Sequence, residues 1–478
     1  MKPDNQKIII DGNEKICGIY NEYTTELQDA LKNTNSNFSI SILEEKLNLA
    51  NKRTQEAYID VTSDILNSVD ETNLILQKKK KEYEAKGIKL VVKDTKERSI
   101  LTTQGKLIYS RKILRPYSSE DELKLKHIEN IKSVVPLDIF LKIDGLPFKI
   151  SPKFMLEIAH HAIKSDSYVE AQGRIYEIYH QKINHETIRS ITNLVGRLVY
   201  DYDCQKADEA MNLHIAKEIQ FKDVIDGILY IEMDGSFINT RIKNNENSTW
   251  VESKLCIIFN SNNLLQYRTK DGDIAYRINK AEYISFIGSV DEFKKHVLAL
   301  ALRNRYNLYK HIVVLSDGAP WIKKFKEEFF PMAQQILDIY HLYENTSKFL
   351  NAVCTEKNKI ESYREKWFEW IDQGQCEKII KDLDKFKDKK IPDDVVNLGQ
   401  YILNNKDNVD YPYYRLIYKF IGSGAIESGN KYVVQRRLKL SGMRWSKEYA
   451  QYLLSLRCKE YSGMWYLVED IFRSYFPM

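Results

Sequence analysis

The chain has 478 residues, of which 43% are hydrophobic and 29% charged, and its formal net charge is +5. A chain of this length can bury a large core and is expected to form two to four domains of about 150 residues each. These values exclude a small disulfide-stapled scaffold. They do not by themselves require a nucleic-acid partner, because the distribution of charge decides that question.

The six cysteines lie far apart in the sequence and form no C-x-x-C pair, which argues against a zinc ribbon and against a disulfide framework. Reduced, buried thiols in a cytosolic protein are the simpler interpretation. The sequence contains no N-terminal apolar signal region and no apolar run of about 18 residues. We therefore expect a cytoplasmic protein without a membrane span.

The N-terminal region, residues 1–120, is predicted to be mostly helical with one small β-hairpin. Apolar residues at spacings of three and four predict a long amphipathic helix, or a helical pair, between about residues 37 and 85. Two β-rich runs around Gly105 predict a hairpin near residues 88–116. The apolar positions that suggest the helical period are Tyr58, Val61, Ile65 and Val69.

Residues 121–222 contain two predicted helices, at about 167–179 and 185–200, with the spacing of a helix-turn-helix. Asn184 is a suitable N-cap for the second helix. A plain helical hairpin would have the same pattern, so both interpretations stay open. One face of the second helix is apolar, with Ile188, Ile191, Val195 and Leu198, and the opposite face carries Arg189, Asn193 and Arg197, which could reach bases and phosphates.

From residue 223 the pattern becomes that of a mixed α/β layer, whose first part is predicted to end at residue 345. A helix capped by Ser289 should follow the first three strands, and a continuous apolar run then indicates a central strand covered on both faces. Strands are predicted at 228–238, 254–260, 283–287 and 311–316, with a further strand-like run at 333–340 before a helix.

Residues 346–420 lose the β pattern and are predicted to form an all-helical insertion. Tyr363, Trp367 and Trp370 fall at helical spacing, and such aromatic stripes are more often core than base-stacking surfaces. Residues 421–478 are predicted to return to the core, with Glu427 at the start of a helix and a basic helix-like run from 430 to 447.

Three acidic residues share a local setting. Asp234 and Asp317 each end a predicted strand and precede a glycine, while Glu427 lies among glycines at the start of a predicted helix. Each Asp-Gly pair alone could be a simple turn. The repeated context instead favours a metal site, because phosphodiester cleavage commonly uses two divalent ions about 3.5–4 Å apart, and carboxylates suit magnesium. We expect two Mg²⁺ ions, with Mn²⁺ as a substitute, provided that the two strands are neighbours.

The residues around these acids fit the same interpretation. Gly235 and Gly318 would allow sharp turns at the strand ends, and Gly422 and Gly424 would leave room beside Glu427. The run that follows Glu427 has no acidic residue and could contact a phosphate backbone, although a solvated basic helix would look the same. Its candidate DNA-binding residues are Lys431, Arg436, Arg437, Lys439, Arg444 and the stacking residue Trp445.

The motifs Met-Asp234-Gly, Leu-Ser-Asp317-Gly-Ala, Asp338-x-x-His341 and Gly-Ser-Gly-Ala-Ile-Glu427-Ser, followed by Arg437-x-Lys-x-x-Gly-Met-Arg-Trp445-Ser, resemble those of bacterial DDE transposases of the ISLre type, which are relatives of Mutator-like enzymes. The resemblance covers roughly residues 225–460. It implies a ribonuclease H-like core interrupted by a helical insertion before the glutamate. It also implies that Asp234, Asp317 and Glu427 form the metal-binding catalytic triad, with Asp338 and His341 as accessory residues.

The leading hypothesis is therefore a transposase of an insertion sequence that cleaves DNA and joins the resulting 3′ hydroxyl to a target. Its partners would be the DNA of the element ends and target, and it would act as a homo-oligomer on DNA. Two alternatives stay open. One is a non-catalytic helix-turn-helix regulator whose acids lie merely at turns, and the other is a ribonuclease H-like nuclease without strand joining.

Overall fold

The computed structural model describes residues 3–32, 39–222, 224–242, 249–270, 272, 274–418 and 420–477. The chain divides into two compact units, one of residues 1–191 with 472–478 and the other of Thr192–Ile471. The division falls inside one long helix, α8 (His185–Ile215). The five-part division made from the sequence stays a prediction.

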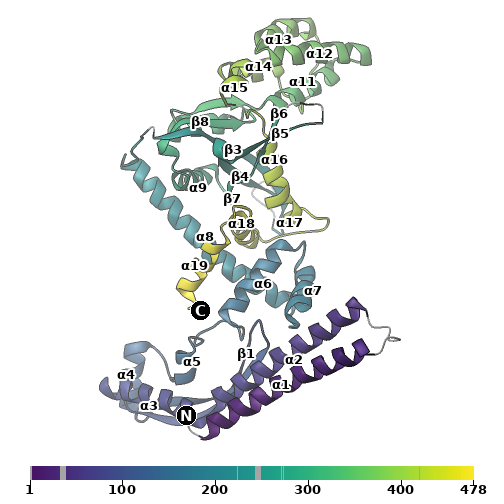
Figure 1. Cartoon of the computed structure of the whole chain (residues 1–478). Coiled ribbons are helices and arrows are strands. Elements are labelled where there is room, and N and C mark those ends of the chain that lie inside the picture. The colour runs from purple at the N-terminus through teal and green to yellow at the C-terminus, as the bar shows by residue number, and fades with distance from the viewer. Residues whose placement is uncertain are drawn as a thin grey trace. The chain divides into compact units, whose positions relative to one another are not determined.

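The first unit consists of helices around a two-stranded antiparallel hairpin (Figure 1). The hairpin confirms the prediction, and its register runs from Leu90 opposite Pro116 to Leu101 opposite Lys106. Its elements are α1 (Pro3–Lys32), α2 (Ile40–Asn67), α3 (Val69–Ala85), β1 (Leu90–Leu101), β2 (Lys106–Pro116), α4 (Ser119–Glu129), α5 (Pro136–Phe140), α6 (Pro152–Lys164) and α7 (Tyr168–Tyr179).

The helical pair predicted before the hairpin is present as α2 and α3, but its buried face differs from the predicted one. Tyr58 and Ile65 are 58% and 39% exposed, whereas Ala57 is fully buried. The reason is that α1, which the sequence pattern did not predict, packs along α2, where Val61 fits against Gly12. The face of α2 is thus set by two partners rather than by one.

The pair α7 and α8 corresponds to the predicted helix-turn-helix. Ser167 caps α7 by accepting a hydrogen bond from the Glu170 backbone, and Asn184 accepts one from Glu186 at the start of α8. The second helix is 31 residues long and ends at Ile215, well beyond the predicted end. The predicted apolar face is buried: Ile188, Ile191 and Val195 have no exposed surface and Leu198 has 8%.

The second unit is built on a five-stranded sheet with the order β7-β4-β3-β8-β9. Strand β4 pairs antiparallel with both β3 and β7. Strand β8 pairs parallel with β3, and β9 pairs parallel with β8. A two-stranded hairpin, β5–β6, interrupts the connection from β4 to β7 and was not predicted. The strands are β3 (Ile225–Asn239), β4 (Trp250–Asn260), β5 (Leu264–Arg268), β6 (Ile274–Ile278), β7 (Glu282–Phe286), β8 (Tyr309–Ser316) and β9 (Gln334–Leu337).

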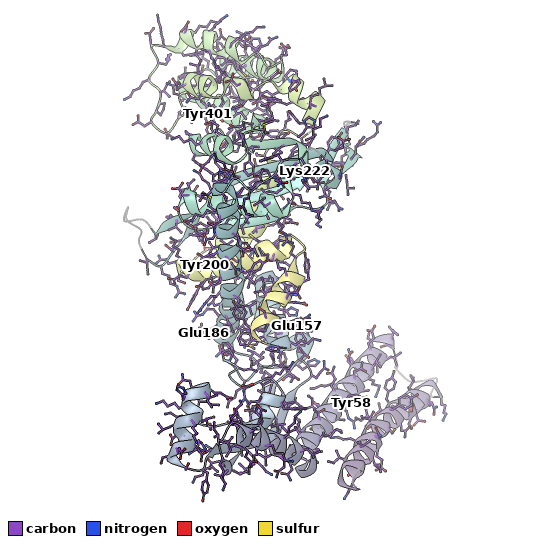
Figure 2. The ribbon with its side chains drawn as sticks, turned by 90° about the vertical axis from the view of Figure 1, so that its left-hand side faces the viewer. Tyr58, Glu157, Glu186, Tyr200, Lys222 and Tyr401 are labelled. Atoms are coloured by element: carbon purple, nitrogen blue, oxygen red, sulfur yellow. The ribbon has the colours of Figure 1, made fainter. Side chains whose placement is uncertain are left out.

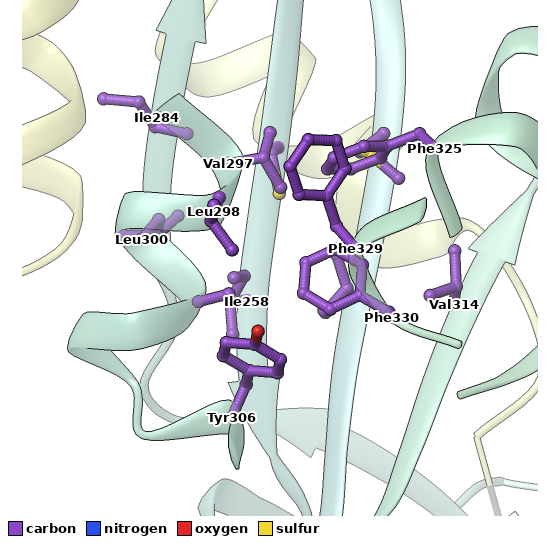
Figure 3. Close-up of a cluster of buried hydrophobic side chains, with 14 of the residues drawn as sticks. Ile258, Ile284, Val297, Leu298, Leu300, Tyr306, Val314, Phe325, Phe329 and Phe330 are labelled. Atoms are coloured by element: carbon purple, nitrogen blue, oxygen red, sulfur yellow. The ribbon is translucent and has the colours of Figure 1, made fainter. Parts of the chain in front are cut away.

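One face of this sheet carries the main hydrophobic core (Figure 3). Alternate residues of β3, namely Leu229, Ile231 and Met233, point into it because side chains alternate along a strand. Helices α9 (Val290–Arg303) and α10 (Pro320–Phe329) supply the opposing side chains. Ser289 caps α9 as predicted. The other face of β3 is therefore free to carry Glu232 and Asp234.

The regular elements of the predicted insertion are all helices among its described residues, and they lie beyond one end of the sheet (Figure 1). Trp367 is fully buried and its indole N–H donates to Asp382, which confirms the core interpretation for this tryptophan. Its elements are α11 (Ile339–Val353), α12 (Lys357–Asp372), α13 (Cys376–Asp382), η3 (Leu383–Phe386), α14 (Leu398–Asn404), η4 (Lys406–Asn408) and α15 (Tyr411–Tyr418).

The chain returns to the sheet through α16 (Gly424–Gly429), which continues into a π-helical segment, η5 (Asn430–Gln435), and the short α17 (Arg436–Leu438). The predicted basic helix thus ends at residue 438, and a loop leads to α18 (Lys447–Tyr461) and α19 (Trp465–Tyr475). Within the described residues, the helices are all too short or too polar to cross a lipid bilayer.

Candidate metal centre

Asp234 and Asp317 come from neighbouring strands. The last paired residues of β3 and β8 are Glu232 and Leu315, and each aspartate stands two residues beyond that pair. Both line one small pocket, together with Glu232, His341 and Ser423. The adjacency on which the metal-site interpretation depended is therefore present.

Asp234 does not end its strand, contrary to the prediction. Strand β3 runs on to Asn239, and Asp234 still pairs with Leu255 of β4. The aspartate becomes accessible because β8 stops at Ser316 and leaves this edge of β3 without a parallel neighbour. The sequence pattern predicts that the strand is no longer covered at Asp234. In the structure, Asp234 is accessible because the neighbouring strand β8 ends early.

Asp317 occupies a tight turn after β8. Gly318 has φ of +87°, which a residue with a side chain rarely adopts, so the predicted sharp turn is confirmed here. The Asp317 carboxylate accepts a hydrogen bond from Ala319 N at 2.9 Å. Tyr401, labelled in Figure 2, comes from α14 of the insertion and donates from its hydroxyl to the Asp317 carbonyl oxygen at 2.7 Å. The insertion thus holds the turn that carries this carboxylate.

The Asp234 carboxylate is held by two donors. Its Oδ1 accepts from Gly235 N at 2.7 Å and its Oδ2 from Asn430 Nδ2 at 2.6 Å. Burial raises the pKa of Asp234 above its usual value, and the negative charge of Asp317 adds to the increase. The two hydrogen bonds and the positive charge of His341 act in the opposite direction. A nearby cation would lower this pKa and favour the carboxylate form.

Asp338 and His341 form a tight pair at the start of α11. Asp338 is fully buried and caps the helix, and its Oδ2 lies 2.5 Å from His341 Nδ1. Burial opposes ionisation of Asp338, but hydrogen bonds from His341 and Ser423 outweigh it and lower its pKa. The hydrogen bond to Asp338 raises the pKa of His341 to about 9, and Asp317 and Asp234 contribute as well. The imidazole is therefore positively charged at neutral pH.

Ser423 connects this pair to Glu427. Its backbone N–H donates to Asp338 Oδ1 at 3.2 Å, and its hydroxyl donates to Glu427 Oε1 at 2.7 Å. One ligand atom each from Asp338, His341 and Glu427 lies within 4.8 Å of the others. This group differs from the predicted triad, because it combines Glu427 with Asp338 and His341. The hydrogen bonds of Ser423 hold the start of α16, which carries Glu427, beside the start of α11. His341 belongs to both groups, since it also lines the pocket of Asp234 and Asp317.

Glu232 is a fully buried carboxyl beneath this site. Its Oε2 accepts from Ile426 N at 3.0 Å, and its buried Oε1 has no hydrogen-bond partner among the described residues. Burial raises the pKa of Glu232 well above its usual value, and the charges of Asp338 and Glu427 raise it further. The side chain thus favours its neutral form while it fixes the backbone beside Glu427.

Of the other predicted glycine roles, the turn at Gly235 is wrong and the close approach at Gly422 is supported. Gly235 makes no turn, because it lies inside β3, where an added Cβ would meet the Glu252 carboxylate at 2.2 Å. Among the described residues no atom lies within 4 Å of a Cβ added at Gly424, so its predicted role stays a prediction. At Gly422 an added Cβ would meet the Tyr340 ring at 2.5 Å, so this glycine does allow a close approach next to Glu427.

The basic run after Glu427 is only partly on the surface. Arg437 is 1% exposed and lies over the Trp445 ring at 5.1 Å, so it does not present a cation to solvent as the prediction required. Trp445 is half-buried, and its backbone pairs with Asn239 next to β3. This packing follows from the loop 439–446, which folds back on the sheet edge. The exposed cations among the candidate DNA-binding residues of this run are Lys431, Arg436, Lys439 and Arg444.

The three candidate DNA-reading residues of α8 differ in exposure. Arg197 is exposed and lies 3.6 Å from Asp201. Arg189 is half-buried and pairs with Glu186, one turn earlier. Asn193 is half-buried, and in the described part of the chain its Oδ1 has no hydrogen-bond partner. The geometry thus leaves Arg197 as the most accessible of the three.

The sequence matches the family described as "Uncharacterised protein family (UPF0236)" over residues 33–468. The chain belongs to this family. No match to a curated protein was found. The UPF0236 match covers both compact units and the whole metal-centre candidate, from Glu232 to Asn430.

The donors of this UPF0236 chain fit divalent metal ions. Four carboxyl groups, those of Asp234, Asp317, Asp338 and Glu427, gather around one imidazolium, so negative charge is in excess. Carboxylate oxygens are the ligands that Mg²⁺ prefers, and Mg²⁺ sites typically use one or two of them together with waters and substrate phosphates. The donor set could therefore hold Mg²⁺, and the two predicted ions stay a prediction.

Three residues of the site were missed from the sequence. Glu232 could have been found, because a glutamate two residues before Asp234 in an apolar strand must share its face. Asn430 lies three residues after Glu427, a helical neighbour on the same side. Nothing in the sequence marked Ser423 as a site residue except its place between two glycines. Its role depends on a hydrogen bond to Asp338, which is 85 residues away.

Proposed function

We propose that this protein is a DDE transposase that cleaves DNA and transfers a strand, with Asp234, Asp317 and Glu427 as its metal-binding triad. The observation that carries the proposal is the shared pocket of Asp234 and Asp317 at the end of the parallel β3–β8 pair, beside the Glu427 segment. The motif resemblance supports it, and the UPF0236 family is associated with transposase-like proteins.

The strand order supports a ribonuclease H-like core as part of this proposal. Numbered by their order along the chain within the five-stranded sheet, the strands lie 3-2-1-4-5, with an antiparallel first half and a parallel second half. The proposed triad takes one residue from the first strand, one from the end of the fourth, and one from a helix after the insertion. Such an arrangement sets carboxylates on rigid elements.

The residues of the chain have separate tasks in this proposal. Asn430 and Gly235 orient the Asp234 carboxylate, and Tyr401 holds the turn of Asp317. Two divalent ions, when bound, would stabilise charge on the attacking and leaving oxygens of the phosphodiester. The protonated His341 supplies one further positive charge, which would favour an anionic substrate.

DNA would be held by surfaces outside the centre. The exposed cations Lys431, Arg436, Lys439 and Arg444 follow Glu427 directly and suit phosphate contacts. Helix α8, with Arg197 on its exposed side, is the proposed reader of element ends. Oligomerisation on DNA is part of the same proposal.

The test uses the full chain, Mg²⁺ or Mn²⁺, and a supercoiled plasmid that carries the coding sequence with its flanking DNA. We expect Asp234→Asn, Asp317→Asn and Glu427→Gln each to lose at least about 10²-fold in nicking rate, as removal of a group that stabilises transition-state charge does. Asp226→Asn is the matched control, because this exposed aspartate lies on the same strand. Nicking that persists in the three variants would sink the proposal.

A strand-transfer assay separates the transposase from the nuclease alternative. Labelled DNA ends with free 3′ hydroxyls are incubated with a target plasmid, and joined products are resolved on a gel. Joining by the parent, and its loss in Asp234→Asn, would support the transposase. Cleavage without any joining would favour the nuclease. A non-catalytic regulator would bind DNA with or without divalent metal and would nick nothing.

A further inference from the structure

Helix α16 separates the metal centre from an open groove on its other side. Ser423 and Ile426 line the pocket of the carboxylates, whereas Gly424, Ala425 and Ser428 line the groove. The helix thus presents one face to each. The groove has a volume of about 890 Å³, which lies in the range of about 300–1,000 Å³ typical of ligand sites. A molecule in the groove would contact the same short helix that carries Glu427.

The other walls of the groove come from the unpredicted β5–β6 hairpin and from the end of α18. Figure 1 shows β5 and β6 next to α16. The hairpin contributes residues 276–281, and the residues that end and follow α18 contribute 460–463. The described residues of this hairpin lie outside the main core, and its side chains Tyr267 and Ile274 are 51% and 55% exposed. Exposed side chains of this hairpin are thus available to contact a ligand.

The lining of the groove combines aromatic rings with cations. Arg277 and Lys280 are exposed, and within the described part of the chain neither forms an ion pair. Glu460 is the acidic residue among the described lining residues. The aromatic side chains in the lining are Tyr276, Tyr283, Phe420 and Tyr461.

We propose that this groove binds unpaired nucleotides of the DNA strand next to the phosphodiester at the metal centre. Aromatic faces stack on bases of any sequence, and cations neutralise the phosphates between them. A paired duplex hides its base faces in its own stack, so it could use only the cations. The combination of both side-chain types therefore selects single strands. This inference rests on the proposed function for the strand's identity, but the binding itself is measured without catalysis.

The first experiment measures binding of a fluorescein-labelled oligothymidylate to the full chain in EDTA by fluorescence anisotropy. The double variant Arg277→Glu/Lys280→Glu should bind roughly tenfold or more weakly. Its salt dependence, the slope of log K against log salt, should fall by about 0.7 for each phosphate that the variant no longer neutralises. The control Lys389→Glu/Lys390→Glu makes the same charge change at exposed positions in the insertion, outside the groove, and should bind as the parent does.

The second experiment isolates stacking. Tyr276→Ala should weaken oligothymidylate binding by at least about fivefold, because one base no longer stacks, and Tyr276→Phe should keep parental affinity. Tyr267→Ala removes a tyrosine from the same hairpin, outside the groove lining, and should have no effect. A duplex of the same length is measured in parallel and should be insensitive to Tyr276→Ala. Thermal unfolding of each variant confirms that it folds.

The outcomes separate this inference from the proposed function. If both groove variants bind oligothymidylate with parental affinity, the groove does not bind unpaired nucleotides, even if Asp234→Asn abolishes nicking. Equal weakening in the groove and control variants would show general charge attraction and would also overturn it. Equal weakening of single-strand and duplex binding would make the groove a duplex surface, which contradicts the proposal. Selective loss of single-strand binding supports it, even if the parent nicks no DNA.

Discussion

Asn430 donates a hydrogen bond from its side-chain amide to the Asp234 carboxylate at 2.6 Å and thereby joins the segment after Glu427 to the central strand β3. The bond spans 196 residues of sequence. Asn430 opens the π-helical segment η5 and is 2% exposed. The amide thus links Asp234 to the helical segment that carries Glu427.

Replacement of Asn430 should impair the reaction through Asp234. The hydrogen bond lowers the pKa of Asp234 against the effect of burial, so Asn430→Ala should raise that pKa. We expect the rising limb of the nicking rate against pH to move to higher pH, and the plateau rate to fall roughly tenfold, the cost of one hydrogen bond to a charged group.

Asn430→Asp adds a like charge beside Asp234 and should lower the nicking rate more than Asn430→Ala does. Gln435→Ala is the control, because Gln435 lies on the same π-helical segment but contacts Ser236. A parental pH profile in Asn430→Ala would show that the amide does not act on the carboxylate.

Glu232 should make the folded state less stable as pH rises. Its pKa is raised in the folded protein, so above the unfolded pKa the folded state binds more protons than the unfolded state. The free energy of unfolding should then fall with pH, by about 1.4 kcal/mol per pH unit for one proton, up to the folded pKa. Glu232→Gln keeps an acceptor for Ile426 N and removes this titration, so its stability relative to the parent should grow from pH 5.5 to pH 8.5.

The measurement is urea unfolding in EDTA at both pH values. Glu365→Gln makes the same change at an exposed position of α12 and should track the parent. A Glu232→Gln difference that does not vary with pH would rule out the buried titration.

His341 should report on metal binding through its pKa. In the folded protein this pKa is raised to about 9, mainly by Asp338. The His341 side chain therefore contributes fully to stability below its pKa in the unfolded chain, and this contribution is lost as pH rises through about 9. Divalent ions among the carboxylates would repel the imidazolium, so 10 mM Mg²⁺, roughly a saturating concentration for such sites, should lower the pKa.

NMR titration of the imidazole resonances measures this pKa directly, with His341→Gln used to assign the signal. Potassium chloride at equal ionic strength controls for screening. A pKa that is the same with and without Mg²⁺ would place the ions elsewhere.

The packing of α8 against α18 should tolerate no added methyl group at Gly196. A Cβ at this position would lie 2.6 Å from the Tyr452 backbone oxygen, and backbone cannot move aside cheaply. We expect Gly196→Ala to lower the free energy of unfolding by about 1–3 kcal/mol, as overpacking does.

Gly173 provides the matched comparison inside α7, because an added Cβ there meets no atom of the described residues within 4 Å. Gly173→Ala should raise the stability by about 0.5–1 kcal/mol, since alanine is the better helix former. Chemical unfolding of both variants measures whether their changes in the free energy of unfolding have opposite signs. Equal effects would mean that helix propensity alone governs both sites.

The sequence by itself determined the elements that depend on local pattern. Apolar runs placed the strands of the main sheet, and helical periodicity placed the insertion and buried Trp367 within it. The turn at Gly318 followed from the Asp-Gly pair. The acids Asp234 and Asp317 stood out because their local contexts repeat, and the structure brings them to one pocket.

Only the tertiary structure decided which groups act together. Asp234 is accessible because β8 ends early, and burial that the local sequence pattern does not show raises the pKa of Glu232. Arg437 looks like a surface cation in the sequence but packs on Trp445. The bonds of Asn430 and Ser423 cross 196 and 85 residues. Local propensity sets the elements, whereas burial, charge and contacts between distant segments depend on how those elements pack.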